Sequence, residues 1–358
     1  MIEASESMSR GTKMSFRRAF FCAGGLAATL LLMLIAGSAS AKTLKIATIV
    51  PEGTSWMVEM RKAAAEIKTR TDGRVKIKFY PGGVMGNDKT VLRKVRAGQL
   101  HGGAFTGGAL AGISADIELY SLPFLFRNYD EVSYVRERMD KKIAAKLEAN
   151  GFVPLAITDG GFAYVMSQQP IRAVEDMKGS KVWLVEDDRM TAMALDLAGV
   201  SPVPLPIADV YTALQTGLIE TVAAPPQGAI AFQWHTKVDY LTDVPVMYLV
   251  GVVAIEKKAF SKLTPPDQKI VREVVGEASR RLDEENRLGE ANAREALQNQ
   301  GVEFVTANSD AEVERWYQIS DEATQRLLEQ NIYSPETIQE ILSLLEEYRA
   351  AQEPEASP

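Results

Sequence analysis

Polar and apolar residues alternate along much of the chain, in stretches that predict strands and helices following one another. Residues 43–50 (TLKIATIV) and 74–80 (RVKIKFY) alternate with a period of two and are rich in β-branched types, which is typical of strands. Between them, Thr54 or Ser55 can cap a helix that runs to about Arg70 and carries one apolar face. The start of the chain therefore predicts a β-α-β unit.

The same alternation continues to about residue 224. Further strands are predicted at 101–107, 153–158, 161–167, 181–185 and 221–224, and helices at 90–97, 130–150, 187–198 and 209–216. Strands that alternate with helices in this way favour parallel sheets covered by helices on both faces. Ligands bind to such folds at the carboxyl ends of the strands.

A long charged helix is predicted from Pro265 to about Gln300. At 1.5 Å per residue it would span on the order of 50 Å, which is too long for one compact lobe. It is therefore expected to run across two lobes. One short strand (302–306), two helices and a polar tail follow it.

Residues 1–41 have the pattern of a secretory signal peptide. Basic residues are followed by an uncharged stretch from Ala19 to Gly37, and the segment ends in the small residues Ala39-Ser40-Ala41. We expect cleavage after Ala41 and a periplasmic location. The alternative is a membrane anchor, because about 19 apolar residues can span a bilayer. Arg17-Arg18 resembles part of a twin-arginine signal, and the choice between the two export routes stays open.

Composition excludes several kinds of function. The only cysteine is Cys22, so a chain that begins at Lys42 has no disulfide, thiolate metal site or cysteine nucleophile. Residues 1–41 carry four basic and two acidic side chains against −7 for the whole chain, so the remainder carries −9. This acidic balance argues against nucleic-acid binding. About 317 residues are enough for two domains.

Reactive groups are few. The two histidines, His101 and His235, have no metal-ligand spacing, and the sequence contains neither a Gly-x-Ser-x-Gly elbow nor a phosphate-binding loop. The acidic run 186–188 is interpreted as a solvated turn. We expect no enzyme activity, no metal and no cofactor. Aromatic residues near the predicted strand and helix ends are instead suited to line a cleft between lobes.

Four segments resemble the extracytoplasmic solute-binding proteins of tripartite ATP-independent periplasmic (TRAP) transporters, the DctP-type family. They are TDGRVKIKFYPGGVMGNDKTVLRKVRAGQL (71–100), LPFLFRNYDEV (122–132), PIRAVEDMKGSKVWL (170–184) and AGVSPVPLPIADVYTALQTGLIETV (198–222). The resemblance implies an α/β, two-lobed periplasmic binding protein fold with mixed sheets flanked by helices and a long lobe-spanning helix. It also implies lobes that close on a ligand and dock on TRAP membrane permease subunits.

On this resemblance the lobes are assigned by residue range. Lobe I comprises 42–160 plus about 251–285, and lobe II comprises 161–250 plus about 286–330. Residues 331–358 form a C-terminal helix and a polar tail.

The chain departs from the family at three polar positions. Trp183 stands where family members place the arginine that clamps a substrate carboxylate, Ala163 stands where a second arginine often lies, and Ala224 replaces an asparagine before proline. A site without these groups is expected to hold an apolar or amphipathic ligand by burial of hydrocarbon, at about 0.8 kcal/mol per CH₂. The subset that looks like this is associated with a tetratricopeptide-repeat partner protein, and the resemblance alone implies this partner.

The candidate ligand-binding residues are Trp56, Phe105, Phe162, Ala163, Tyr164, Trp183, Asp187, Tyr211, Ala224, Pro226, Gln227 and Trp234. A conventional organic acid held through Arg189 is the alternative ligand hypothesis. A sensor-linked binding protein and a periplasmic enzyme on the same fold are the remaining alternatives.

Overall fold

The computed structural model describes residues 41–186 and 188–352. The predicted signal peptide with Cys22, the candidate residue Asp187 and the polar tail 353–358 lie outside these ranges. Residues from Lys42 onward form one compact unit. No helix in the described ranges is long and apolar enough to cross a membrane.

The strands are β1 (Lys42–Thr48), β2 (Val75–Tyr80), β3 (Gly102–Thr106), β4 (Phe152–Ser167), β5 (Trp183–Val185), β6 (Val203–Leu205), β7 (Thr221–Ala224), β8 (Tyr240–Glu256) and β9 (Glu303–Val305). The α-helices are α2 (Ser55–Arg70), α3 (Asp88–Arg96), α4 (Tyr129–Ala149), α5 (Arg189–Leu197), α6 (Val210–Thr216), α7 (Pro226–Ala231), α8 (Lys257–Phe260), α9 (Pro265–Asn299), α10 (Asp310–Glu329) and α11 (Pro335–Gln352). Short 3-10 turns include η2 (Ala115–Ser121), η3 (Val174–Met177) and η5 (Trp234–Lys237).

The main sheet is mixed, in the order β2-β1-β3-β8-β4-β7, with β9 beside β8. β1 pairs in parallel with β2 and β3, whereas β8 runs antiparallel to β3 and β4. The strand alternation alone suggested parallel sheets, and the antiparallel pairs correct that expectation. The expected fold of mixed sheets flanked by helices is confirmed.

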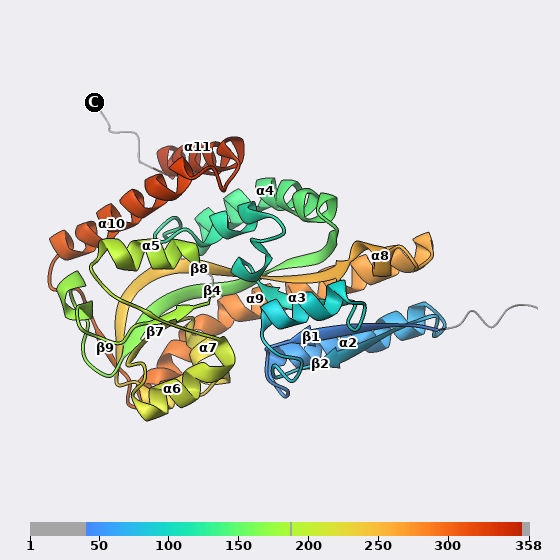
Figure 1. Ribbon diagram of the computed structural model, residues 1–358, viewed down its shortest axis with the longest axis horizontal. Helices are drawn as coiled ribbons and strands as arrows, with labels where there is room; N and C mark the ends of the chain where they lie inside the picture. The colour runs from blue at the N-terminus through green and yellow to red at the C-terminus, as the bar shows by residue number, and fades with distance from the viewer. Residues whose placement is uncertain (1–40, 187, 353–358) are drawn as a thin grey trace, which may run out of the picture. The chain divides into compact units, whose positions relative to one another are not determined.

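Two long antiparallel strands, β4 and β8, join the two ends of this sheet (Figure 1). β3 pairs with the stretch of β8 from Gly251 to Ile255, whereas β9 pairs with its opposite end from Tyr240 to Thr242. β4 was expected as two strands separated at residues 159–160. It continues through them because Gly161, with φ +86°, forms a bulge that a residue with a side chain rarely adopts.

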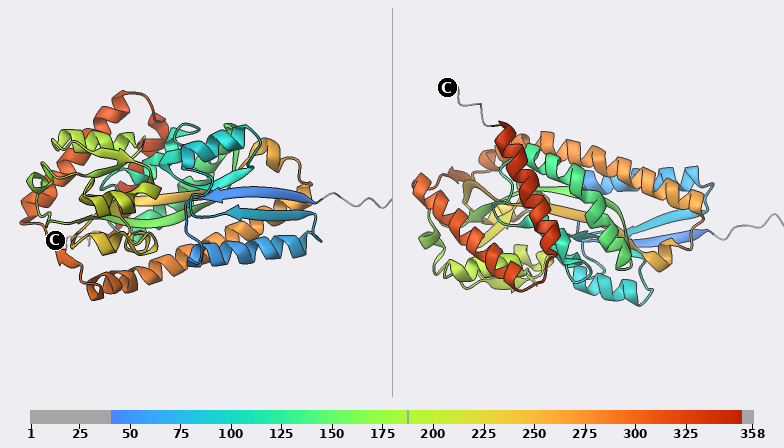
Figure 2. Two further views of the ribbon diagram at one scale, coloured as in Figure 1. Left: turned by 60° about the horizontal axis from the view of Figure 1, so that its bottom comes forward. Right: turned by 90° about the horizontal axis from the view of Figure 1, so that it is seen from above.

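The long helix α9 ends within one residue of its predicted limit. Thr264 caps its start by accepting a hydrogen bond from the Asp267 amide. The helix packs against α2, β4 and α7, and its N-terminal part lies beside α2 in Figure 2. It therefore contacts elements at both ends of the sheet.

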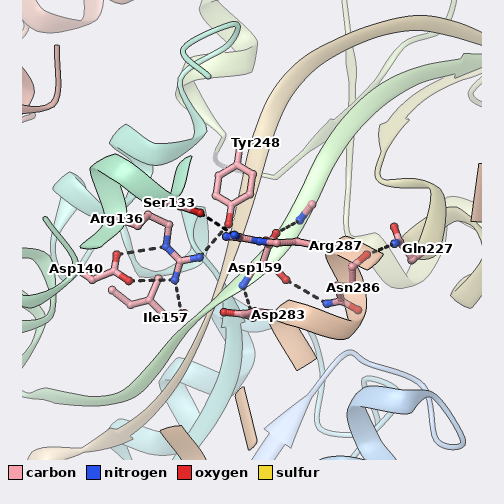
Figure 3. A network of polar contacts seen from close by, with 11 residues as sticks. Ser133, Arg136, Asp140, Ile157, Asp159, Gln227, Tyr248, Asp283, Asn286 and Arg287 are labelled. Atoms are coloured by element: carbon pink, nitrogen blue, oxygen red, sulfur yellow. Dashed lines mark hydrogen bonds and ion pairs between the residues drawn. The ribbon is translucent and has the colours of Figure 1, made fainter. Parts of the chain in front are cut away.

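A network of buried charges holds α4 and α9 onto the middle of β4 (Figure 3). From α4, the Arg136 guanidinium donates to the Tyr248 hydroxyl at 2.9 Å and to the Ile157 carbonyl at 2.6 Å. From α9, Arg287 Nε donates to the Asp159 carboxylate at 2.8 Å, and its Nη1 donates to Ser133 at 2.7 Å.

Asp159 is the centre of this network. Its carboxylate also accepts from the Gly161 amide at 2.8 Å, and its own amide donates to the Asp283 carboxylate at 2.8 Å. Burial, together with the nearby Asp159 charge, raises the pKa of Asp283 to about 6. The network therefore fixes the bulge in β4 against helix α9.

Asp159→Asn tests how much this anchoring contributes to stability. The Asp159 side chain is 1% exposed, and its loss as an anion leaves Arg287 without its carboxylate partner. We expect the free energy of unfolding to fall by about 2–3 kcal/mol, measured by urea denaturation. Glu52→Gln, which disrupts the exposed Arg61–Glu52 pair, is the matched control and should leave the urea midpoint unchanged. Equal losses in the two variants would contradict the buried anchor.

Candidate functional site

Two groups of aromatic rings lie in the same core cluster, on the face of the sheet that carries Tyr164, Trp183 and Ala224. In the first, which we call the tyrosine group, Phe162 packs edge-on against Tyr129 with centroids 5.0 Å apart and lies 5.5 Å from Tyr248. In the second, the indole group, Trp183 meets Trp234 edge-on at 5.2 Å, and Phe232 stacks on Trp234 at 5.4 Å. These rings come from α4, β4, β5, β8 and the segment after α7.

The indole of Trp183 is fixed in place and is 7% exposed. Its Nε1 donates to the Leu205 carbonyl at 3.0 Å, at the carboxyl end of the neighbouring strand β6. The N–H is therefore already satisfied and the ring packs against Trp234. Where the family resemblance places an arginine, the chain presents an aromatic face with no cation.

The structure brings most of the candidate residues into this core cluster. Its buried members include Phe105, Phe162, Tyr164, Trp183, Ala224 and Trp234, and Tyr211 packs against it. Pro226 is buried at the start of α7, and the side chain of the adjacent Gln227 donates to the Asn286 carbonyl at 2.9 Å. The tyrosine hydroxyl of Tyr164 donates to Glu290 at 3.1 Å.

Two candidates lie elsewhere. Trp56 packs against Phe79 at 6.3 Å in a separate core cluster formed with α2 and the N-terminal half of α9. Ala163 is fully buried on the opposite face of β4 from Phe162 and Tyr164, as expected for a neighbouring strand residue. Neither is brought into contact with the aromatic groups.

A cluster of acidic side chains, not singled out from the sequence, lies near the start of α5. The Glu118 carboxylate from η2 is 6% exposed and accepts a hydrogen bond from the Tyr333 hydroxyl at 3.0 Å. Burial, aided by the nearby charge of Asp188, raises the pKa of Glu118 to about 7, and Arg189 partly offsets this rise. Asp188 caps α5 through the Thr191 amide, and burial raises its pKa as well.

A direct hydrogen bond joins the two halves of the chain beside this cluster. The Asn87 side chain, at the start of α3, donates to the Glu186 carboxylate at 3.0 Å. One residue further on, Asp88 accepts from the amide and hydroxyl of Thr106 at 3.1 and 3.0 Å, and burial raises its pKa. Carboxyl groups with raised pKa values thus gather around the carboxyl ends of β3 and β5.

The sequence carried only a faint signal for Glu118. It is a charged residue inside the apolar run from Ile117 to Leu122, and such a residue is a candidate for a buried, partnered group. Its partner Tyr333 is 215 residues away, so no local pattern could have paired them. Among the described residues, no group of three or more His, Cys, Asp or Glu side chains is arranged to hold a metal ion.

A family model described as bacterial extracellular solute-binding protein, family 7 (DctP), matches residues 46–331. The chain belongs to this family. The 2,3-diketo-L-gulonate-binding periplasmic protein YiaO of Escherichia coli is 26% identical over 277 residues, which cover 75% of this chain and 82% of YiaO. An uncharacterized protein of Haemophilus influenzae is 28% identical and covers 76% of this chain and 86% of its own length.

Solved structures of TRAP periplasmic solute-binding proteins have the same fold. The protein of Xanthobacter autotrophicus, with bound β-D-galacturonate, superposes with a TM-score of 0.76 at 24% identity and covers 84% of this chain and 99% of its own. The protein of Haemophilus influenzae, with bound L-gulonate, gives a TM-score of 0.78 at 18% identity and covers 85% and 99%. The chain is therefore, by its family, an extracellular solute-binding protein, and it shares the fold of these TRAP proteins.

Glu118→Gln tests the buried carboxyl group in this protein. A raised pKa means that the folded state binds the Glu118 proton more tightly than the unfolded state. Its contribution to stability is therefore full below about pH 4.5 and is lost as the pH rises to about 7. Since glutamine carries no charge, we expect the variant to match the parent protein at pH 5 and to exceed it by up to about 3 kcal/mol at pH 8.

Urea denaturation of both proteins at the two pH values measures this difference. Glu340→Gln, on the exposed face of α11, is the control because its side chain is 45% exposed. A stability difference for Glu118→Gln that is the same at pH 5 and pH 8 would show that the Glu118 pKa is ordinary.

Proposed function

We propose that this protein closes its two lobes on a small organic acid in the periplasm and delivers it to a TRAP membrane permease. The ligands named for its relatives support an organic acid as the ligand of this protein. The Xanthobacter autotrophicus and Haemophilus influenzae structures hold β-D-galacturonate and L-gulonate, and YiaO is named for binding 2,3-diketo-L-gulonate. Each of these molecules carries one carboxylate. A signal peptide cleaved after Ala41 would account for export.

Arg189 is the proposed partner of the carboxylate. It is the first residue of α5, directly beyond the carboxyl end of β5, where ligands of α/β sheets bind. Its side chain is exposed and makes no hydrogen bond or ion pair with any residue in the described ranges. The positive end of the α5 dipole adds to its charge. By contrast, the Arg287 guanidinium is already engaged by Asp159 and Ser133.

An apolar or amphipathic ligand is the second candidate, and one observation favours it. The position matched to the carboxylate-clamping arginine holds Trp183, whose N–H is bonded to Leu205 and whose ring packs on Trp234. Burying a carboxylate against this surface would be costly, whereas hydrocarbon would be stabilised there. This candidate places the protein in a subset without the clamping arginine, together with its tetratricopeptide-repeat partner.

Calorimetric titration of the mature protein tests the two ligand classes. One panel contains galacturonate, glucuronate and gulonate, and the other contains neutral and alkyl compounds of similar size. If an organic acid is the ligand, Arg189→Ala should weaken its binding roughly tenfold to hundredfold, because a charge-assisted hydrogen bond is lost. Arg326→Ala is the control, since Arg326 pairs with Glu322 on the exposed face of α10.

The outcomes separate the proposals. Binding of an acid that falls in Arg189→Ala and persists in Arg326→Ala supports the organic-acid proposal. Acid binding that survives Arg189→Ala removes Arg189 from the site. Binding only of neutral or alkyl compounds overturns the acid and supports the second candidate.

A further inference from the structure

A cavity lies on the face of β4 opposite the tyrosine group, and Trp183 at the start of β5, a member of the indole group, lines it as well. It is bounded by β4, β7 and β8 on one side and by α5, α10 and η3 on the other, and its volume is about 110 Å³. Val165 and Ala223 form part of its floor, whereas the neighbouring residues Tyr164 and Ala224 belong to the core on the other face. The cavity is therefore separate from the tyrosine group.

The walls of this cavity are almost entirely hydrocarbon. Val174 and Leu195 are buried side chains of the wall, and Phe124 contributes a ring that packs edge-on against Trp316 at 6.2 Å. The Phe124 backbone has φ +55°, which a phenylalanine rarely adopts. Its amide is held there by the Val246 carbonyl at 2.8 Å. The chain thus keeps this ring at the cavity wall at some conformational cost.

Every hydroxyl of the wall has a partner within the protein. The Thr191 hydroxyl donates to Asp188 at 2.6 Å, the Ser320 hydroxyl donates to the Pro123 carbonyl at 2.6 Å, and the Thr221 hydroxyl is bonded to Ser180 at 2.8 Å. Trp316 is different. Its side chain is 6% exposed, and its Nε1 has no hydrogen-bond partner in the part of the chain that the structure describes. A buried donor without an acceptor costs about 1–3 kcal/mol.

Water is poorly suited to supply that acceptor. An ordered buried water makes two to four hydrogen bonds, and the wall offers it only one free side-chain group. Apolar cavities of roughly 150 Å³ stay dry and take up benzene-sized molecules. A charged ligand is disfavoured as well, because none of the described residues that line the cavity has an ionised side chain to pair with it.

We propose that this cavity is a second binding site, which takes a small uncharged hydrocarbon that carries one hydrogen-bond acceptor, such as a cyclic ketone or a short alcohol. The hydrocarbon fills the space under Val174 and Leu195, and the acceptor takes the Trp316 N–H. The site does not depend on the identity of the ligand bound for transport.

Indole N–H signals of the full-length mature protein test this proposal. The chain has four tryptophans, so ¹⁵N-labelled protein gives four indole cross-peaks, and Trp316→Phe identifies the one from Trp316. Cyclohexanone is the probe. We expect it to shift the Trp316 signal with a dissociation constant on the order of 1 mM and to leave the Trp56 signal in place. Cyclohexanecarboxylate, of similar size but charged, should leave the Trp316 signal in place.

Two kinds of variant check the location. Ala194→Leu fills the cavity from α5 and should abolish the response to cyclohexanone, whereas Ala65→Leu on the exposed face of α2 should leave it unchanged. If Ala194→Leu does not fold, Val174→Ile takes its place as the cavity-filling variant, because it adds a single methylene to the wall. Trp316→Phe keeps the wall apolar and should weaken cyclohexanone binding roughly two- to tenfold, followed through the Trp183 signal or by calorimetry.

The proposal fails if cyclohexanone leaves the Trp316 signal unmoved at 20-fold the expected dissociation constant, on the order of 20 mM. It also fails if Ala194→Leu and Val174→Ile both bind the probe as the parent protein does. Titration of the transport ligand into Ala194→Leu distinguishes the two sites, because its affinity should not change.

Discussion

The pairing of β4 with β8 is the constraint on which the rest of the structure depends. These two strands share hydrogen bonds from Phe152 to Ser167 on one and from Tyr240 to Glu256 on the other, with three further strands attached at one end and two at the other. A continuous pair of strands transmits its twist along its length, so the two ends of the sheet cannot be placed independently. The bulge at Gly161 and the Asp159 network lie in the middle of this pair, between the strands attached at its two ends.

Charge is arranged differently at the centre and at the edge of the protein. At the centre, Arg136 donates to Asp140 and Tyr248 and Arg287 donates to Asp159 and Ser133, so buried charges cancel over short distances. Near the carboxyl ends of β3 and β5, acids gather with hydroxyl and amide donors rather than with cations. Glu118 and Asp188 repel one another, and Arg189 is the nearby positive charge.

Local patterns in the sequence predict the helices and strands in which polar and apolar residues recur at regular spacing. β1, β2, α2 and α9 fall within a few residues of their predicted limits because each has one buried face or a distinct cap. β8 was not predicted. Its sequence, YLTDVPVMYLVGVVAIE, is apolar on both faces in its second half and contains Pro245, so it shows neither alternation nor a clear strand start. The sequence predicts two strands in place of β4, because Asp159-Gly160-Gly161 has the composition of a turn. For the site, the aromatic residues could be chosen by type, whereas Glu118 and Tyr333 meet only through tertiary folding.

The length of α9 has a mechanical consequence. The helix has 35 residues and is packed against α2 toward one end and α7 toward the other. At 1.5 Å per residue it is a rod of about 52 Å, and a bend of about 10° at its middle would displace either end by roughly 4–5 Å. Helices resist such bending unless proline, glycine or an inserted group interrupts them. If the two lobes separate, their motion must either flex α9, for which Gly276 and Gly289 are the weakest points, or make it slide over one of its neighbours. A helix that flexed in this way would store part of the energy of opening.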